Sequence, residues 1–211
     1  MTMDLIRLSA RSVRDLLKDR QVGPLELLDA LEHRISEVDG AVNALPTLCF
    51  ERARQRARES DLSGLPLAGI PVAIKDLLPV SGVRTTFGSM AYRDHIPEVS
   101  DLLVERIEAA GGIVYAKSNT PEFGAGANTF NDVFGFTRNP WNTALSAAGS
   151  SGGSAVALAT GMAWLATGSD LGGSLRNPAS FCSIVGLRPS QGRIASDGGH
   201  NHNRIRQSRH P

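Results

Sequence analysis

The chain has 211 residues, of which 41% are hydrophobic and 20% charged, and its formal net charge is +1. This composition indicates a globular protein with one substantial domain, and the near-neutral charge argues against a nucleic acid held by bulk electrostatics. Two cysteines, Cys49 and Cys182, are too few for a disulfide framework and fit a reducing compartment. Without a signal peptide or an apolar run of ~20 residues, we expect a cytoplasmic protein with no membrane partner.

Two amphipathic helices are predicted near the amino terminus. The stretch 8–22 carries an apolar stripe, and either Ser9 or Ser12 can cap it. Gly23-Pro24 ends this helix and begins a second one, which is predicted to reach about Val38. Apolar stripes of this kind usually pack on the parent domain, so we interpret both helices as part of the core.

The next elements are typical of a layered α/β domain. A strand over 44–50 precedes a charged helix over 51–60, whose interleaved acidic and basic residues indicate a solvated face rather than an RNA-binding patch. A helix over 100–110, which Ser100 can cap, leads into a strand over 113–116. This order of strands and helices predicts an α/β fold.

A short buried strand is predicted over 72–74, and Lys75 and Asp76 follow it directly. One interpretation is that the lysine reaches solvent or pairs with Asp76. The other is that burial lowers the pKa of Lys75 and allows it to act as a base. The spacing alone leaves both interpretations open.

The segment 120–143 contains Phe, Asn and Gly but little periodicity, which is typical of an ordered loop that lines a site. Trp141 within it is interpreted as a packing anchor. Four short elements are predicted after this loop: a helix over 154–161, a strand over 162–168, a helical turn over 178–183 and a strand over 184–187.

The character of the chain changes near Ile194. Residues 196–211 contain almost no apolar side chain, a composition that predicts disorder. His200 and His202 lie there without any cysteine or carboxylate cluster, so no metal site is expected. We therefore divide the chain into a folded portion, 1–193, and a polar tail, 194–211.

Two Gly/Ser turns, at 149–153 and 172–174, indicate a place where backbone N–H groups and hydroxyls converge. A phosphate cradle is one interpretation, but neither glycine motif of such sites is present. A nucleophile elbow is another, because 149–153 matches G-x-S-x-G with Ser151 in the nucleophile position. That scheme needs a strand before the turn and a later histidine, and the later histidines all lie in the polar tail.

A third interpretation needs no histidine. A serine is activated by a lysine through a second serine. Ser174 follows two glycines whose N–H groups can face an oxyanion, Ser150 can pass a proton, and Lys75 can receive it if burial keeps it neutral. Residue chemistry alone leaves this scheme as one hypothesis among the three.

Several motifs, in order along the chain, resemble the amidase signature family. They are GIPVAIKD at 69–76, AGSSGGS at 148–154, GSDLGGSLR at 168–176, PASFC at 178–182 and VGLRP at 185–189. The similarity runs from the amino-terminal helices to about Arg193. It implies an α/β fold with a mixed β-sheet core covered by helices, of which the carboxyl-terminal part is missing.

The resemblance also implies roles for individual residues. Ser174 is the nucleophile, Ser150 the bridging serine after a cis peptide bond, and Lys75 the general base. The remaining implied site residues are the oxyanion-hole N–H groups of Leu171, Gly172, Gly173 and Ser174, and the supporting residues Ser151, Asp170 and Arg176. The implied reaction is hydrolysis of a carboxylic amide to an acid and ammonia or an amine through an acyl-enzyme, without metal or organic cofactor.

Two departures from the family pattern bear on function. Ala148 stands where the family usually has glycine, and the resemblance ends near Arg193 although family members continue well beyond. A frameshifted or truncated gene is our preferred account, so we expect a poorly soluble or inactive chain. The alternatives are an inactive remnant and the glutamine-hydrolysing subunit of a transfer-RNA amidotransferase. The partners considered are a small-molecule amide and a second copy in a homodimer, with no nucleic acid bound directly.

Overall fold

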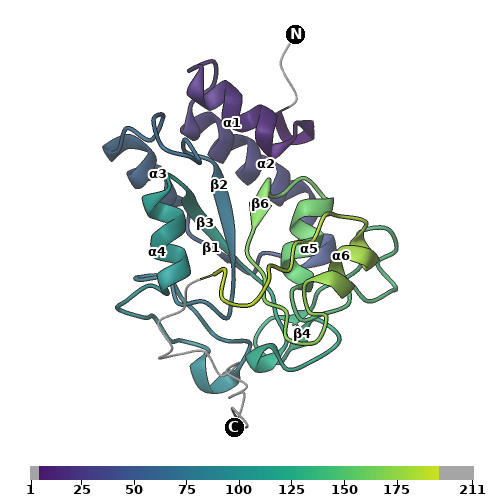
Figure 1. Ribbon diagram of the computed structural model, residues 1–211. Coiled ribbons are helices and arrows are strands. Elements are labelled where there is room, and N and C mark those ends of the chain that lie inside the picture. The colour runs from purple at the N-terminus through teal and green to yellow at the C-terminus, as the bar shows by residue number, and fades with distance from the viewer. Residues whose placement is uncertain (1–4, 195–211) are drawn as a thin grey trace, which may run out of the picture.

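The structure, a computed structural model, describes residues 5–194 and is built on a four-stranded sheet of order β1-β3-β2-β6 (Figure 1). The strands are β1 (Thr47–Leu48), β2 (Pro71–Lys75), β3 (Ile113–Ser118) and β6 (Leu165–Ala166). The central strand β2 is parallel to β3 and to β6, and β1 is antiparallel to β3. The sheet is therefore mixed, and the predicted α/β fold is confirmed.

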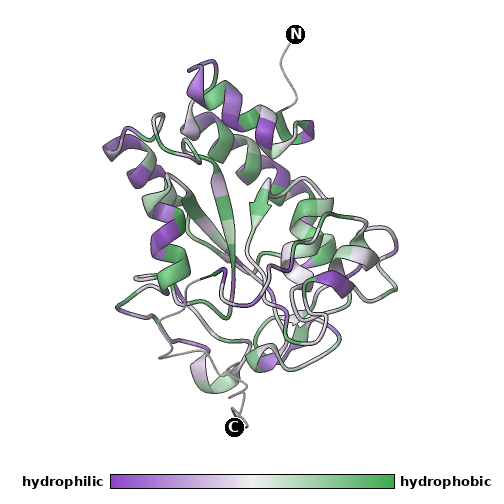
Figure 2. Ribbon diagram, in the orientation of Figure 1, coloured by the Kyte–Doolittle hydropathy of each residue, from purple (hydrophilic) through white to green (hydrophobic). Residues whose placement is uncertain are grey.

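The two central strands are buried on both faces, and their side chains alternate between two clusters. Ala73 belongs to the larger cluster, which α2 (Pro24–Val42), α3 (Phe50–Glu59) and α5 (Gly152–Ala159) share. Val72 and Ile74 belong to the smaller one, which includes Val104 of α4 (Leu102–Ala109). Helices thus cover both faces, and Figure 2 shows the mainly apolar strands between helices of mixed polarity.

Local sequence determines the amino-terminal helices. The helix α1 (Ala10–Lys18) begins after Ser9, whose side chain accepts a hydrogen bond from the Ser12 N–H, so capping by Ser9 is confirmed. The helix α2 continues past the predicted end near Val38 as far as Val42, because no residue before Asn43 adopts the left-handed conformation that stops it. Its apolar stripe is buried, as predicted.

Two predictions near α4 and in the long loop are wrong. The N-cap of α4 is Asp101, which accepts from the Leu103 N–H, whereas the Ser100 hydroxyl accepts from the Ser81 N–H. Trp141 is not a packing anchor: the residue is 68% exposed, and its indole N–H donates to the Cys182 carbonyl at 3.1 Å. The long loop also forms a 3-10 helix, Glu122–Gly124, and a hairpin of β4 (Phe130–Asn131) and β5 (Gly135–Phe136).

The carboxyl-terminal elements differ from those predicted. Within 162–168 only β6 is a strand, and the helical turn is α6 (Arg176–Cys182). The strand predicted over 184–187 does not form, because no strand of the described residues lies beside it, and Val185 is 93% exposed. The polar tail from residue 195 onward, with His200 and His202, lies outside the described residues. No helix within 5–194 is long and apolar enough to span a membrane.

Candidate active site

Three segments meet at one edge of the sheet. Lys75 is the last residue of β2, and the segment 167–175 follows β6. Because β2 and β6 are parallel and adjacent, both chains leave the sheet at the same edge. The first Gly/Ser turn leads into α5, which packs against both strands. The fold therefore brings together Lys75, Ser150 and Ser174, which the sequence separates widely.

Lys75 is buried, with 1% of its surface exposed, and its amine is surrounded by hydroxyl groups. Its Nζ lies 2.6 Å from Ser150 Oγ, 2.9 Å from Ser151 Oγ and 3.0 Å from Ser169 Oγ. Burial lowers the pKa of Lys75 to about 7, although the negative charge of Asp170 acts in the opposite direction. The interpretation that this lysine reaches solvent or pairs with Asp76 is therefore wrong. Lys75 is instead suited to accept a proton.

The first turn presents two serines to Lys75. The peptide bond between Gly149 and Ser150 is cis, as the resemblance implies, and Ala148 adopts φ +58°. The Thr129 hydroxyl fixes the turn from below by donating to the Ala148 carbonyl at 2.9 Å and accepting from the Gly152 N–H at 3.0 Å. A Cβ at residue 152 would lie 2.3 Å from that hydroxyl, so the close approach requires glycine.

The second turn is organised around the Asp170 carboxylate, whose side chain is fully covered. It accepts from the backbone N–H groups of Gly173 at 2.8 Å and Leu175 at 3.1 Å. It also accepts from the Arg176 N–H at 3.2 Å and from Nε and Nη2 of the same residue, each at 3.0 Å. The guanidinium and these N–H groups hold the pKa of Asp170 well below its ordinary value, despite burial. Asp170 and Arg176 thus brace the turn.

Ser174 lies at the end of this turn, half-buried. Its carbonyl accepts from the Ser151 N–H at 3.1 Å, while its hydroxyl makes no hydrogen bond with any residue in the range 5–194. Of the four N–H groups of the expected oxyanion hole, that of Gly173 donates to Asp170, and the other three have no partner in the described part of the chain. The structure connects Lys75 to Ser150 directly, but it does not connect Ser150 to Ser174 by a hydrogen bond.

Sequence reasoning missed two contacts of this site. Ser169 supplies a third hydroxyl to Lys75, and Arg188 donates to the backbone carbonyl of Asp170 at 3.1 Å. Both residues belong to motifs that carry the family resemblance, but nothing in the residue pattern assigns them a partner. Their roles become visible only when the turn after β6 is placed beside the end of β2.

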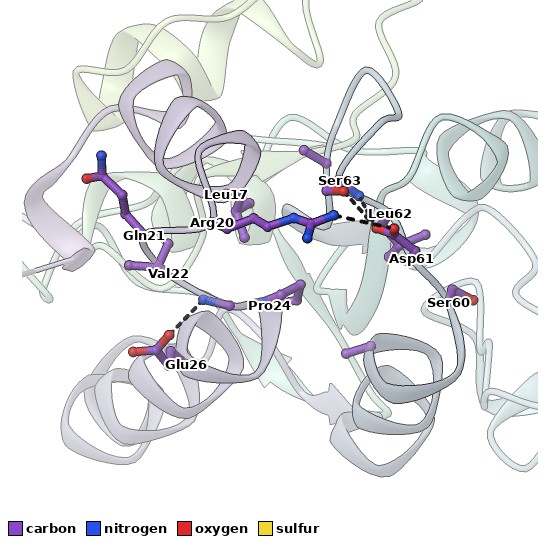
Figure 3. A pocket seen from close by; sticks show the side chains of 13 residues that line it. Leu17, Arg20, Gln21, Val22, Pro24, Glu26, Ser60, Asp61, Leu62 and Ser63 are labelled. Atoms are coloured by element: carbon purple, nitrogen blue, oxygen red, sulfur yellow. Dashed lines mark hydrogen bonds and ion pairs between the residues drawn. The ribbon is translucent and has the colours of Figure 1, made fainter.

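A separate hollow of about 280 Å³ lies between the turn that joins α1 to α2 and the segment after α3 (Figure 3). Arg20 reaches across it toward Asp61, at 3.8 Å, and both side chains are more than 70% exposed. None of the predicted site residues lines it, so it is distinct from the site around Lys75. Across residues 5–194, no group of three or more His, Cys, Asp or Glu side chains is arranged to hold a metal ion.

The chain is similar to known proteins in sequence and in structure. The family profile described as Amidase matches residues 26–209. One subunit of the glutamyl-tRNA(Gln) amidotransferase of Methylacidiphilum infernorum is 43% identical over 196 residues, which cover 93% of this chain and 40% of that protein. The chain thus spans about two-fifths of the length of this relative.

Two solved structures are similar to the chain over most of its length. A bacterial aryl acylamidase of the amidase signature family superimposes with a TM-score of 0.85 at 31% identity, covering 92% of this chain and 42% of that one. The 6-aminohexanoate cyclic dimer hydrolase, in complex with its substrate, gives a TM-score of 0.84 at 34% identity, covering 90% and 39% respectively.

Proposed function

The chain belongs to the amidase signature family, and we propose that it hydrolyses a small carboxylic amide to an acid and ammonia or an amine. The observation that carries the proposal is the 2.6 Å contact between Lys75 Nζ and Ser150 Oγ. A buried lysine that is surrounded by hydroxyls and has no carboxylate partner can be neutral at neutral pH and can accept a proton. We also propose that residues 1–193 are the amino-terminal portion of an amidase signature domain and that residues 194–211 are a polar tail.

The proposed acylation step moves one proton along a chain of three residues. Ser174 Oγ forms a bond to the amide carbon and passes its proton to Ser150, which passes its own proton to Lys75. The amide C–N bond then breaks, and the proton returns from Lys75 through Ser150 to the leaving nitrogen. The Ser174 hydroxyl, which has no hydrogen bond within the described residues, must turn toward Ser150 for this transfer; such contacts often tighten only when substrate binds.

We propose that the backbone N–H groups of Leu171, Gly172 and Ser174 donate hydrogen bonds to the amide oxygen and stabilise the negative charge that develops on it. These groups have no partner among residues 5–194, and Asp170 takes the remaining one, from Gly173. Preorganised N–H donors of this kind stabilise an oxyanion strongly in a site that excludes water. Water then attacks the acyl-enzyme by the same proton path and releases the acid.

The similarity to a subunit of an amidotransferase favours a second candidate. At 43% identity to that glutamyl-tRNA(Gln) amidotransferase subunit, the chain is also a candidate for the glutamine-hydrolysing subunit of a transfer-RNA amidotransferase. The third candidate is an inactive remnant. The three candidates differ in substrate and turnover, while the arrangement of Lys75 and its serines is common to all of them.

The test of the nucleophile is covalent labelling by a fluorophosphonate, followed by intact mass measurement. We expect one adduct in the full chain and none in Ser174→Ala. The matched control is Ser180→Ala, which removes an exposed serine from α6 and leaves labelling unchanged. An adduct that persists in Ser174→Ala would refute Ser174 as the nucleophile.

Ammonia release distinguishes the candidates. Turnover of simple amides that disappears in Ser174→Ala supports the hydrolase. Turnover of glutamine alone supports the amidotransferase subunit. Labelling of Ser174 without turnover of either substrate class supports the inactive remnant, because the nucleophile is then present but the reaction is not completed.

A further inference from the structure

Arg188 connects the segment after α6 to the turn that precedes that helix. Its Nε donates to the backbone carbonyl of Asp170 at 3.1 Å and lies 3.3 Å from Asp170 Oδ1. The same carboxylate holds the N–H groups of Gly173 and Leu175, on either side of Ser174. From this juxtaposition we propose that Arg188 is a positioning residue, which fixes the turn carrying Ser174 and balances the charge of Asp170 beside Lys75. The inference rests on the proposed function, because it concerns the same nucleophile and base.

The segment that carries Arg188 is fixed at both ends. The Ile184 N–H donates to the Ala179 carbonyl of α6 at 2.9 Å. A Cβ at Gly186 would lie 2.6 Å from the Ala179 Cβ, so the backbone rests directly on the helix. At the other end the Arg188 guanidinium reaches Asp170. The contact between Arg188 and Asp170 therefore closes residues 170–188, which include Ser174 and α6, into one loop.

The charges around Asp170 explain why two arginines accompany one carboxylate. Arg176 and Arg188 both contact it, and their side chains are about half exposed, at 57% and 46%. The Asp170 carboxylate favours the protonated form of Lys75 and so raises its pKa. Two positive groups on this carboxylate reduce that effect, and they leave Lys75 free to be neutral.

The other groups around Lys75 do not contribute a net charge. Its contacts from the two Gly/Ser turns are the hydroxyls of Ser150, Ser151 and Ser169. Asp76, the next residue in the chain, pairs with Lys117 of β3 at 3.2 Å, and the two charges compensate each other. The balance at Lys75 therefore depends on Asp170 and on the arginines that cover it.

The test uses three variants of the full chain. Arg188→Gln removes the charge and keeps a polar side chain of similar length, and Arg188→Lys keeps the charge but loses the planar guanidinium. Arg58→Gln is the matched control, since it makes the same change of charge on the exposed side of α3. For the wild-type chain and for each variant, the free energy of unfolding is measured as a function of pH. The same measurement is made on that chain with Lys75→Met added, and the two curves are compared. This comparison reports the titration of Lys75 without requiring turnover.

We expect the stability of the wild-type chain, relative to Lys75→Met, to rise with pH from about pH 7, where Lys75 titrates in the folded state. In Arg188→Gln that rise should begin roughly half a pH unit higher, because a partly screened unit charge near a buried site shifts a pKa by about that amount. Arg188→Lys and Arg58→Gln should leave it in place. Near pH 7, the rate of fluorophosphonate labelling of Ser174 should fall about two- to threefold in Arg188→Gln, because a smaller fraction of Lys75 is then neutral. At pH 9 Lys75 is neutral in both chains, so any decrease in labelling that remains there measures displacement of the turn.

The outcomes separate this inference from the proposed function. A wild-type chain whose stability follows that of Lys75→Met at every pH would overturn the proposed base, and this inference with it. A wild-type rise that Arg188→Gln leaves unmoved overturns the inference alone. A shift of the same size in Arg58→Gln also overturns it, because the effect would then come from net charge and not from the contact with Asp170.

Discussion

Lys75 and Lys117 are two buried lysines at the ends of neighbouring strands, and their surroundings differ in kind. Each has 1% or less of its surface exposed. Lys75 Nζ contacts three serine hydroxyls. Lys117 Nζ contacts the Leu78 carbonyl at 2.7 Å, Thr85 Oγ1 at 2.8 Å and Asp76 Oδ1 at 3.2 Å. The carboxylate of Asp76, which follows Lys75 in the chain, thus pairs with Lys117 and not with Lys75.

The hydrogen-bond inventory of the two sites indicates their charge states. Around Lys117 every contact is an acceptor, because the Thr85 hydroxyl donates to the Val83 carbonyl. Only an ammonium group has three donors and no lone pair to turn toward an acceptor. Burial lowers the pKa of Lys117, and the Asp76 carboxylate opposes that shift. Around Lys75 a hydroxyl can donate to the amine lone pair, so the neutral form is accommodated.

The comparison teaches that burial alone does not make a base. Desolvation acts on both lysines, but a carboxylate at one of them keeps the proton in place. Lys117 fixes the loop that begins at Asp76, whose other oxygen accepts from both the N–H and the hydroxyl of Thr86. Lys75, with hydroxyls alone, remains available for proton transfer. A lysine with a buried counter-charge and the lysine that we propose as the base thus lie on neighbouring strands.

The largest expected effect comes from Asp76→Asn, which removes the carboxylate that pairs with Lys117 and leaves both buried lysines without a carboxylate contact. Lys117 would then be a buried charge without a counter-charge, and we expect the free energy of unfolding to fall by about 3–5 kcal/mol. Urea denaturation at pH 7 measures it. The control is the double variant Asp76→Asn/Lys117→Met, which should recover most of the loss. A loss below about 1 kcal/mol in the single variant would show that Lys117 is not charged.

The second prediction concerns the pH dependence of stability that Lys75 confers. Its pKa is about 7 in the folded chain, below the ordinary value of 10.5. Between these two values the unfolded chain binds more protons, so stability must rise with pH, by up to about 1.4 kcal/mol per unit. From pH 7.5 to 9.5 the wild-type chain should gain about 2–3 kcal/mol relative to Lys75→Met.

The control for that experiment is Lys18→Met, which removes an exposed lysine from α1. It should retain the wild-type rise. If Lys75→Met shows the same rise, the titrating group is a different one, and Lys75 does not differ from Lys117 in the way proposed.

The sequence predicts one of these two lysine sites and not the other. The residue pattern around Lys75 and the two Gly/Ser turns offers a base and its serines as one hypothesis among three, and only the family resemblance assigns these roles. Asp76 is expected to pair with Lys75 if with anything, because the two are adjacent in the chain. Its actual partner follows from the register of β2 on β3, which places Lys117 opposite Ile74. A pairing across strands has no local pattern in the sequence.

The fold shows the same division. Helices with a clear stripe and a capping residue, such as α1, are predicted correctly in kind because these determinants lie within one turn, although α1 ends at Lys18 and not at the predicted residue 22. The strand expected over 184–187 has suitable apolar residues, yet a strand requires a neighbour, and none of the described strands lies beside this segment. The contacts of Ser169 and Arg188 escape prediction for the same reason, since their partners come from elsewhere in the chain.

The third prediction concerns Thr85→Val, which removes a hydrogen bond from Lys117 but leaves its counter-charge, Asp76, in place. Thr85→Val keeps the shape of a fully buried side chain but removes an acceptor from the ammonium group. A hydrogen bond to a charged group contributes about 1.5–3 kcal/mol, and we expect a loss of about 2 kcal/mol in the free energy of unfolding. Urea denaturation measures this loss. The comparison variant is Thr86→Val, which removes a hydroxyl from the Asp76 carboxylate and not from Lys117. A loss of about 1 kcal/mol or less would indicate that Lys117 makes a neutral contact.

The smallest expected effect comes from Ser169→Ala, which makes the equivalent deletion at Lys75. If Lys75 is neutral at pH 7.5, it loses a hydrogen bond between uncharged groups, and the expected cost is about 1 kcal/mol. Below pH 6, where the same amine carries a proton, the lost contact is a charged one and the cost should rise toward that of Thr85→Val. Urea denaturation of Ser169→Ala at both pH values measures this change. A cost that equals that of Thr85→Val at pH 7.5 would mean that both lysines are charged, and the difference between them would then lie in geometry alone.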